Sequence, residues 1–177
     1  NGTGNSKDWP TSLVIDDRSN VLITGWSTGV GGENDMDIAT LKYDLNGNLM
    51  WVTRYEGKGN CDEEGNSIGV DKSGNVYVTG STGYIYGSSD GEVKDDLLLV
   101  KYDASGNKKW ERRYNGSYDG SDRGYSLIVD YDGNICVTGV TEVAQVKYSH
   151  SDYVTIKYNP EGEKLWEKIY KRSQNSG

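Results

Sequence analysis

The sequence contains three copies of one repeat, and this feature constrains the fold more than any other. The first copy opens with Ser-Leu-Val-Ile-Asp at Ser12–Asp16, passes through Val-Leu-Ile-Thr-Gly and Leu-Lys-Tyr-Asp, and closes at Tyr55. Closely similar runs recur twice. Each copy carries three marker residues, an asparagine, a lysine and a tryptophan. They are Asn20, Asn75 and Asn134; Lys42, Lys101 and Lys157; and Trp51, Trp110 and Trp166. Self-similarity of this kind is typical of repeat architectures, in which each copy forms one small unit and neighbouring units bury each other's apolar faces.

Each copy contains four candidate strands. In the first copy, apolar and β-branched runs predict strands over 12–16, 20–25, 37–43 and 49–55. A turn of the type Asp-x-x-Gly-Asn follows the first and the third strand, because aspartate bonds the backbone two residues on and glycine takes the left-handed conformation of a hairpin loop. The turns are Asp16–Asn20, with serine in place of glycine, Asp44–Asn48, Asp71–Asn75, Asp103–Asn107, Asp130–Asn134, and the looser Asn159–Glu163.

Apolar character falls from the middle of each copy to its last strand. The run Leu97–Val100 is continuously apolar, which is typical of a strand covered on both faces. The run Lys108–Tyr114 instead sets one tryptophan among charges, as expected of an outer edge strand. We therefore predict an all-β fold of β-propeller blades, with three tandem four-stranded antiparallel sheets forming half or part of a propeller. The expected blades of this single repeat domain, 1–177, cover about 10–55, 65–114 and 124–170.

Composition supports the all-β class and excludes some partners. The chain has 24 glycines, 2 prolines, 14 tyrosines and no phenylalanine, which suits short strands joined by tight turns. A formal charge of −8, with no basic run, argues against nucleic acid or an anionic membrane surface as a partner. No apolar run reaches the roughly 20 residues that cross a bilayer, so we expect no membrane insertion.

The repeat resembles a known family. The runs Asp71–Gly80 and Lys101–Tyr114, with the motifs Asp-x-x-Gly-Asn-Val-Tyr-Val-Thr-Gly, Lys-Tyr-Asp-x-x-Gly-Asn and Trp-x-x-Arg-Tyr, are similar to the bacterial β-propeller repeat family, called SBBP repeats. Ser19 in place of glycine and Ile169 in place of arginine are local departures. The resemblance implies a propeller module of a secreted or surface-exposed protein, usually without an assigned activity. An extracellular or cell-surface location is therefore expected from the resemblance alone.

Topology predicts where a ligand would bind. In an up-and-down blade the short turns lie on one face, and the variable segments 26–36, 81–95 and 140–151 lie on the other. Variable loops on a rigid scaffold usually carry specificity. Aromatic rings beside carboxylates suit a glycan or a protein loop. The candidate ligand-binding residues are Trp26, Glu33, Asp35, Tyr84, Tyr86, Asp90, Glu92 and Tyr148, although acidic loops also serve solubility alone.

Other repeated positions favour a structural role, and no chemical motif stands out. Asp37, Asp96 and Asp152, like Trp51, Trp110 and Trp166, occur once per blade, which favours blade-to-blade contacts over ligand contacts. The single histidine, His150, has no cysteine nearby, and Asp130–Gly133 lacks the remaining ligands of a calcium loop. We expect no catalytic residues, no metal and no cofactor.

The function expected from the sequence is a non-catalytic scaffold or adhesion and protein-interaction module. A carbohydrate-binding propeller is the alternative, and part of a propeller hydrolase or lyase is a third possibility. The expected partners are further propeller blades, because three sheets leave two apolar faces uncovered. A homodimer closing a six-bladed ring, another self-assembly, or the rest of a longer chain would each supply such blades.

Overall fold

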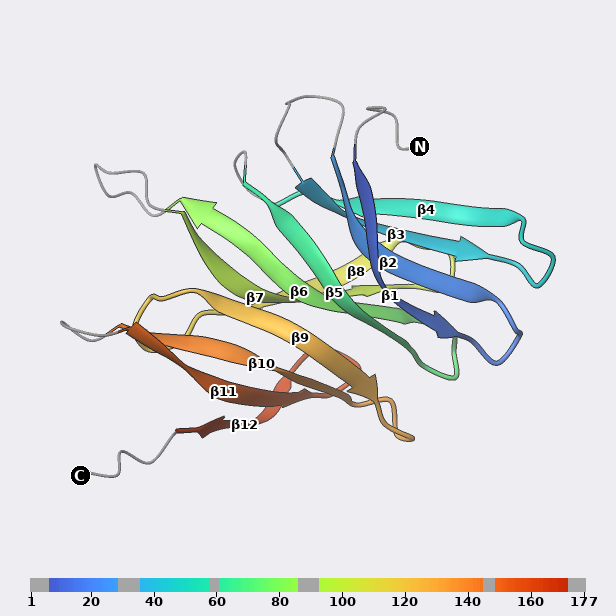
Figure 1. The fold of residues 1–177 in the computed structure, drawn as a ribbon. Helices are drawn as coiled ribbons and strands as arrows, with labels where there is room; N and C mark the ends of the chain where they lie inside the picture. The colour runs from blue at the N-terminus through green and yellow to red at the C-terminus, as the bar shows by residue number, and fades with distance from the viewer. Residues whose placement is uncertain (1–6, 29–35, 58–60, 86–92, 145–148, 172–177) are drawn as a thin grey trace.

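The computed structural model describes residues 7–28, 36–57, 61–85, 93–144 and 149–171, and these contain twelve β-strands and no helix. The strands form three four-stranded antiparallel sheets, here called blades 1, 2 and 3 (Figure 1). Blade 1 contains β1 (Asp8–Ile15), β2 (Val21–Thr28), β3 (Met36–Tyr43) and β4 (Leu49–Tyr55). Blade 2 contains β5 (Glu63–Val70), β6 (Val76–Ile85), β7 (Val93–Tyr102) and β8 (Lys108–Tyr114). Blade 3 contains β9 (Asp122–Val129), β10 (Ile135–Ala144), β11 (Ser149–Tyr158) and β12 (Lys164–Tyr170). The predicted all-β class and three tandem sheets are confirmed.

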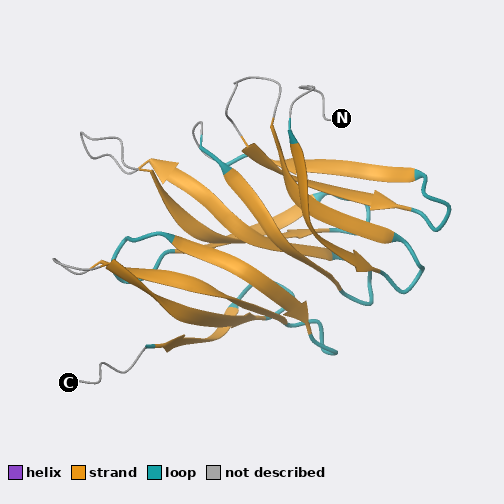
Figure 2. Ribbon diagram, viewed as in Figure 1, coloured by secondary structure: helices purple, strands orange, loops and turns teal. Residues whose placement is uncertain are grey.

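The repeated turns share one set of hydrogen bonds. Figure 2 shows these turns as short teal links between strands. In the Asp44–Asn48 turn, the Gly47 N–H donates to the Asp44 carbonyl oxygen at 3.0 Å, and the Asn48 N–H donates to the Asp44 carboxylate at 2.8 Å. Gly47 has a φ of 80°, in the left-handed region that glycine adopts without strain. Ser19 takes the same conformation, with a φ of 63°, although it has a Cβ.

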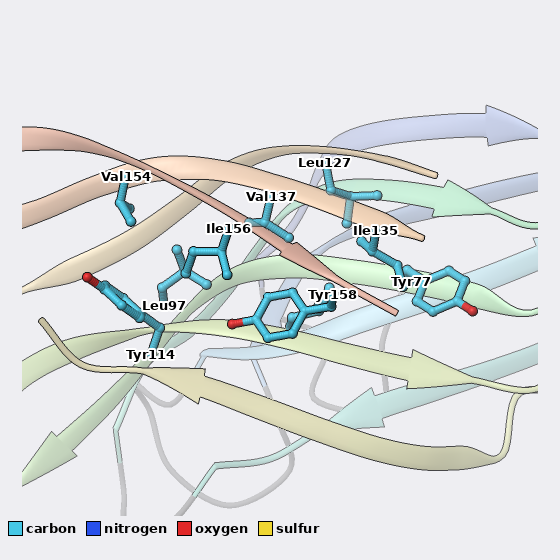
Figure 3. Packing of buried hydrophobic residues seen from close by; sticks show 10 residues of the cluster. Tyr77, Leu97, Tyr114, Leu127, Ile135, Val137, Val154, Ile156 and Tyr158 are labelled. Carbon is cyan, nitrogen blue, oxygen red and sulfur yellow. The ribbon is translucent and has the colours of Figure 1, made fainter. Parts of the chain in front are cut away.

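The blades stack face to face through their apolar residues. Their first strands lie side by side, because β1 contacts β5 and β5 contacts β9. The core between blades 1 and 2 contains Leu22, Ile38, Tyr55, Ile68, Val76, Val78, Leu98, Val100 and Tyr102. The core between blades 2 and 3 contains Tyr77, Leu97, Leu99, Tyr114, Leu127, Ile135, Val137, Val154, Ile156 and Tyr158 (Figure 3).

Blade 2 is covered on both faces. Leu97 and Leu99 point into the core with blade 3, whereas Leu98 and Val100 point into the core with blade 1. All four side chains are 0% exposed. The continuous apolar run therefore has the cause predicted from sequence, and each buried side chain contributes roughly 1.5–3 kcal/mol of transfer free energy.

The strands extend beyond the apolar runs. In blade 1, β1 begins at Asp8 rather than residue 12, and its pairing with β2 is interrupted by a bulge between Pro10 and Ser12. The segments 81–95 and 140–151, expected to be loops, include the ends of β6, β7, β10 and β11. Polar residues such as Thr82, Asp95 and Glu142 interrupt the apolar pattern at these ends, so apolar patterning does not reveal them. Gly80 faces the equivalent bulge in blade 2, where a Cβ would overlap the Glu64 carbonyl oxygen, which explains the repeated glycine.

Candidate functional site

The structure places two of the predicted ligand-binding residues. Trp26 lies within β2, and the backbone of Tyr84 lies within β6, opposite Lys94. Both positions were expected in loops but are strand positions. The remaining candidates fall outside the described residues: Glu33, Asp35, Tyr86, Asp90, Glu92 and Tyr148. The predicted ligand-binding loop face therefore stays a prediction.

Trp26 instead contributes to a hollow on blade 1. Its ring stacks on that of Trp9, its partner across the β1–β2 ladder, with centroids 6.3 Å apart and an interplanar angle of 9°. Both rings line a hollow of about 430 Å³, which is within the size range of ligand pockets. Further lining side chains come from β2, β3 and β4: Ile23, Leu41, Tyr43, Leu49, Val52 and Arg54. The hollow is mainly apolar, with one cationic group.

Hydrogen bonds hold the cationic group of the hollow in place. Arg54 Nη2 donates to Ser27 Oγ at 2.7 Å, and Nη1 donates to the Ser27 carbonyl oxygen at 3.3 Å. Nη1 also lies 3.5 Å from the carboxylate of Asp37. Ser27 Oγ in turn donates to the carboxylate of Asp8. These contacts join β1, β2, β3 and β4 at one end of the blade and orient the guanidinium of Arg54.

The hollow occupies a blade face that is covered in the other two blades. Alignment of the repeats at the Asn20, Asn75 and Asn134 markers makes Ile23 equivalent to Val78 and Val137. Val78 and Val137 are 0% exposed, because blade 1 covers the first and blade 2 covers the second. Ile23 is only partly buried, because no described residue covers this face of blade 1. The hollow is thus the uncovered counterpart of a blade-to-blade interface.

Blade 3 has the complementary uncovered face. The positions equivalent to Tyr153 are Ile38 and Leu97, and both are 0% exposed, whereas Tyr153 is 66% exposed. Tyr170 shows the same difference from its equivalents: it is 71% exposed, whereas Tyr55 and Tyr114 are buried. Tyr153 and Tyr170 stack on each other with ring centroids 6.4 Å apart. Identical repeat positions therefore change from buried to exposed at the two ends of the stack.

The repeated tryptophans connect each blade to the next. Trp51 Nε1 of blade 1 donates to the Ala104 carbonyl oxygen of blade 2 at 3.1 Å. Trp110 Nε1 of blade 2 makes the equivalent bond to the Pro160 carbonyl oxygen of blade 3 at 3.2 Å. Trp166 lies on the uncovered face of blade 3, and its side chain is 41% exposed.

The repeated aspartates are buried within their own blades. Asp37 pairs with Ser27, Asp96 with Thr82 and Asp152 with Thr141 across the ladders of the second and third strands. The blade-to-blade role expected for these aspartates stays a prediction. Burial raises the pKa of Asp96, and the carboxylate of Asp122 nearby adds to the effect.

One buried ion pair lies at the turn end of blade 1. Lys42 Nζ is 2.9 Å from the carboxylate of Asp16, and both side chains are almost fully buried. Burial alone would raise the pKa of Asp16, but the bond from Lys42 and those from Asn20 and Arg18 outweigh it and lower the pKa well below its usual value. The pair fastens the β1–β2 turn to β3.

Neither a metal site nor a membrane-spanning helix is found in the part of the chain that the structure describes. Within it, no three histidine, cysteine, aspartate or glutamate side chains are grouped as metal ligands. No described helix is long and apolar enough to span a bilayer.

A family model described as a β-propeller repeat, SBBP, matches residues 2–32 and 51–87. The chain carries SBBP β-propeller repeats. The match covers parts of the first two copies, and blade 3 shares their turns and tryptophans. The resemblance stated from the sequence and the propeller-blade class are confirmed. A comparison with curated proteins finds no match.

Among solved structures, the SBBP blades are similar to a gluconolactonase from Xanthomonas campestris. The TM-score is 0.47 and the identity 12%, and the similarity covers 96% of this chain and 49% of the gluconolactonase. The chain thus spans about half of that protein's length. The neighbour's name is that of an enzyme, so the expectation that these blades form a non-catalytic scaffold or adhesion module is not confirmed. The enzyme name applies to that protein and assigns no activity to this chain.

Proposed function

We propose that the three SBBP blades form one segment of a closed propeller, and that each end face binds the complementary face of a further blade of the same type. The support comes from one observation. Equivalent repeat positions are buried at both blade-to-blade interfaces and exposed at both ends of the stack, as in the series Ile38, Leu97 and Tyr153. The binding activity of the chain therefore resides in its two outer sheets.

The exposed surfaces have the chemistry of interfaces. The face of blade 1 exposes Trp9, Leu13, Ile15, Leu49 and Val52, each at least 54% exposed. The face of blade 3 exposes Tyr125, Ile128, Tyr153, Trp166 and Tyr170. Contiguous apolar patches of this kind on a protein surface usually mark binding sites. The two faces present different residues, so each is suited to the other rather than to itself.

The hollow on blade 1 is explained by the same function. In the internal interfaces, the positions of Leu41 and Tyr43 are occupied by residues that the preceding blade covers, namely Val100 and Tyr102. A blade docked on blade 1 would fill the hollow with its own side chains. The SBBP resemblance supports an extracellular or cell-surface location for such a propeller.

A single polypeptide that carries two copies of the 177-residue sequence in tandem tests this proposal. Hydroxyl-radical labelling, read by mass spectrometry, reports the exposure of each tyrosine. We expect Tyr170 and Tyr153 to be labelled about tenfold less than Tyr131, because docked blades exclude solvent from an interface core. Tyr131 lies in a turn, is 85% exposed, and serves as the internal reference. Labelling of Tyr170 at the level of Tyr131 in both copies would refute blade docking.

A further inference from the structure

We infer that the blade docked on each end face belongs to a second copy of this chain, and that two copies close a six-bladed ring through two identical head-to-tail interfaces. This inference rests on the proposed function and adds the identity of the partner. In each interface, the outer face of blade 3 of one copy would pack on the outer face of blade 1 of the other.

The number of blades selects two copies. The described residues form three blades, so two copies of them supply six blades and three copies supply nine. Propellers close with about four to eight blades. Two copies of the three described blades fall within that range, whereas one copy or three copies do not. A two-fold axis along the propeller axis relates the copies, and the heterologous contact closes after two steps.

The turn glycines identify where the tryptophan of the partner would lie. A Cβ at Gly106 would be 2.9 Å from the ring of Trp51, and one at Gly162 would be 3.0 Å from the ring of Trp110. The turn glycine of each following blade thus leaves room for the tryptophan of the preceding blade. Gly47 is the equivalent glycine of blade 1, and nothing lies within 4 Å of its Cβ position. The vacant position fits the ring of Trp166, the one repeated tryptophan without a blade beyond it in the described chain.

A hydrogen bond accompanies each of these ring contacts. The bonds from Trp51 to the Ala104 carbonyl and from Trp110 to the Pro160 carbonyl span adjacent blades. The equivalent acceptor in blade 1 is the carbonyl of Leu45, whose residue is 70% exposed. Trp166 of one copy would donate to Leu45 of the other, so that the ring contact and the bond are satisfied together.

A second polar pair fits the same register. Arg113 Nη2 of blade 2 donates to the Tyr55 hydroxyl of blade 1 at 3.0 Å. At the next interface Ile169 replaces the arginine, and the Tyr114 hydroxyl donates to Glu167 instead, at 3.0 Å. Blade 1 carries the arginine at this position, Arg54, and the exposed hydroxyl of Tyr170 is its expected partner. The closing interface therefore repeats the chemistry of the interface between blades 1 and 2.

Light scattering and native mass spectrometry of the 177-residue chain test the inference. We expect a dimer with twice the chain mass of 19.6 kDa at micromolar concentration. Gly47→Asn should weaken the dimer roughly 100-fold, because its side chain fills the space of a partner tryptophan in both interfaces. Gly133→Asn is the matched control, with a φ of 83° on a turn away from the proposed interface, and should leave the dissociation constant within about threefold. Asparagine tolerates the left-handed conformation, so both variants should fold.

Two further measurements test the register. Tyr170→Phe should weaken the dimer roughly tenfold, because it removes the hydroxyl but keeps the ring. A mixture of Gly47→Asn and Trp166→Arg chains should associate more tightly than either variant alone, because one intact interface forms between them. A mixture without this gain would exclude head-to-tail docking. A stable monomer or an open polymer of the unaltered chain would overturn closure by a second copy, whereas protection in the tandem polypeptide would still support blade docking.

Discussion

Replacement of Trp110 and Trp166 by alanine separates the contribution of an internal blade interface from that of an end face. Trp110 is partly buried against the core of blades 2 and 3, its ring contacts Tyr77 at 6.1 Å between centroids, and its indole N–H bonds the Pro160 carbonyl. Replacing a fully buried tryptophan by alanine lowers the free energy of unfolding by about 3–5 kcal/mol. Partial burial lowers this value and the lost hydrogen bond adds about 1 kcal/mol, so we expect Trp110→Ala to cost about 3 kcal/mol.

Trp166 has the same repeat position but lacks a covering blade, so its replacement should cost the single chain only about 1 kcal/mol. Urea melts of both variants should be measured in the Gly47→Asn background, so that dimerisation does not contribute. The free energy of unfolding from linear extrapolation, at unchanged m-value, gives the two losses. Equal losses for Trp110→Ala and Trp166→Ala in that background would refute the assignment of an internal interface and a free face.

Four smaller changes test the turns and the buried carboxylates. Ser19→Gly should raise the free energy of unfolding by about 0.5 kcal/mol, because glycine adopts the left-handed conformation without strain. Gly133→Ser should lower the free energy of unfolding by about 1 kcal/mol for the same reason. Thermal melts check both variants. Asp16→Asn should destabilise the fold by about 3 kcal/mol at pH 7, because it leaves Lys42 buried and unpaired. This difference should begin to shrink as the pH falls below about 4 and should disappear only in stronger acid, because the pKa of Asp16 in the folded protein lies well below its usual value. Asp96→Asn should act in the opposite direction, since a raised carboxyl pKa costs stability as the pH rises above about 4; stability measured against pH should show a gain at pH 7 that vanishes in acid.

Most of the fold could be predicted because the repeated turns carry their own structural information. An aspartate, a glycine and an asparagine at fixed spacing define the turn at Asp44–Asn48 and its copies, and the strands lie between these turns. Strand ends were predicted less well. The segment around Trp9 and Pro10 pairs with β2 beyond a bulge, but it contains no alternating apolar pattern that would indicate a strand.

The candidate site was predicted less well. Trp26 was assigned to a variable loop because the copies differ in length after Gly25, but the ladder with β3 continues to Thr28. The blade-to-blade role expected for Asp37 stays a prediction, because the register of β2 and β3 shows only that it lies opposite Ser27. Strand register depends on pairing between segments far apart in sequence, which one repeat motif does not specify. The two end faces, by contrast, were predicted from the sequence, because three sheets leave two apolar faces uncovered.

The stack of blades explains why the outer faces resemble interiors. In a repeat sequence every copy carries apolar residues on both faces of its blade, because each internal blade must bind one neighbour before it and one after it. Blade 2 satisfies both requirements, with Leu97 on one face and Leu98 on the other, each 0% exposed. Blades 1 and 3 retain the same two-sided pattern, yet each has only one covering blade in the described chain. Solenoids of repeats usually end in units with a polar outer face, whereas here Leu13 is 65% exposed at one end and Tyr170 is 71% exposed at the other. A stack with apolar ends is therefore consistent with a ring, in which every blade has two neighbours.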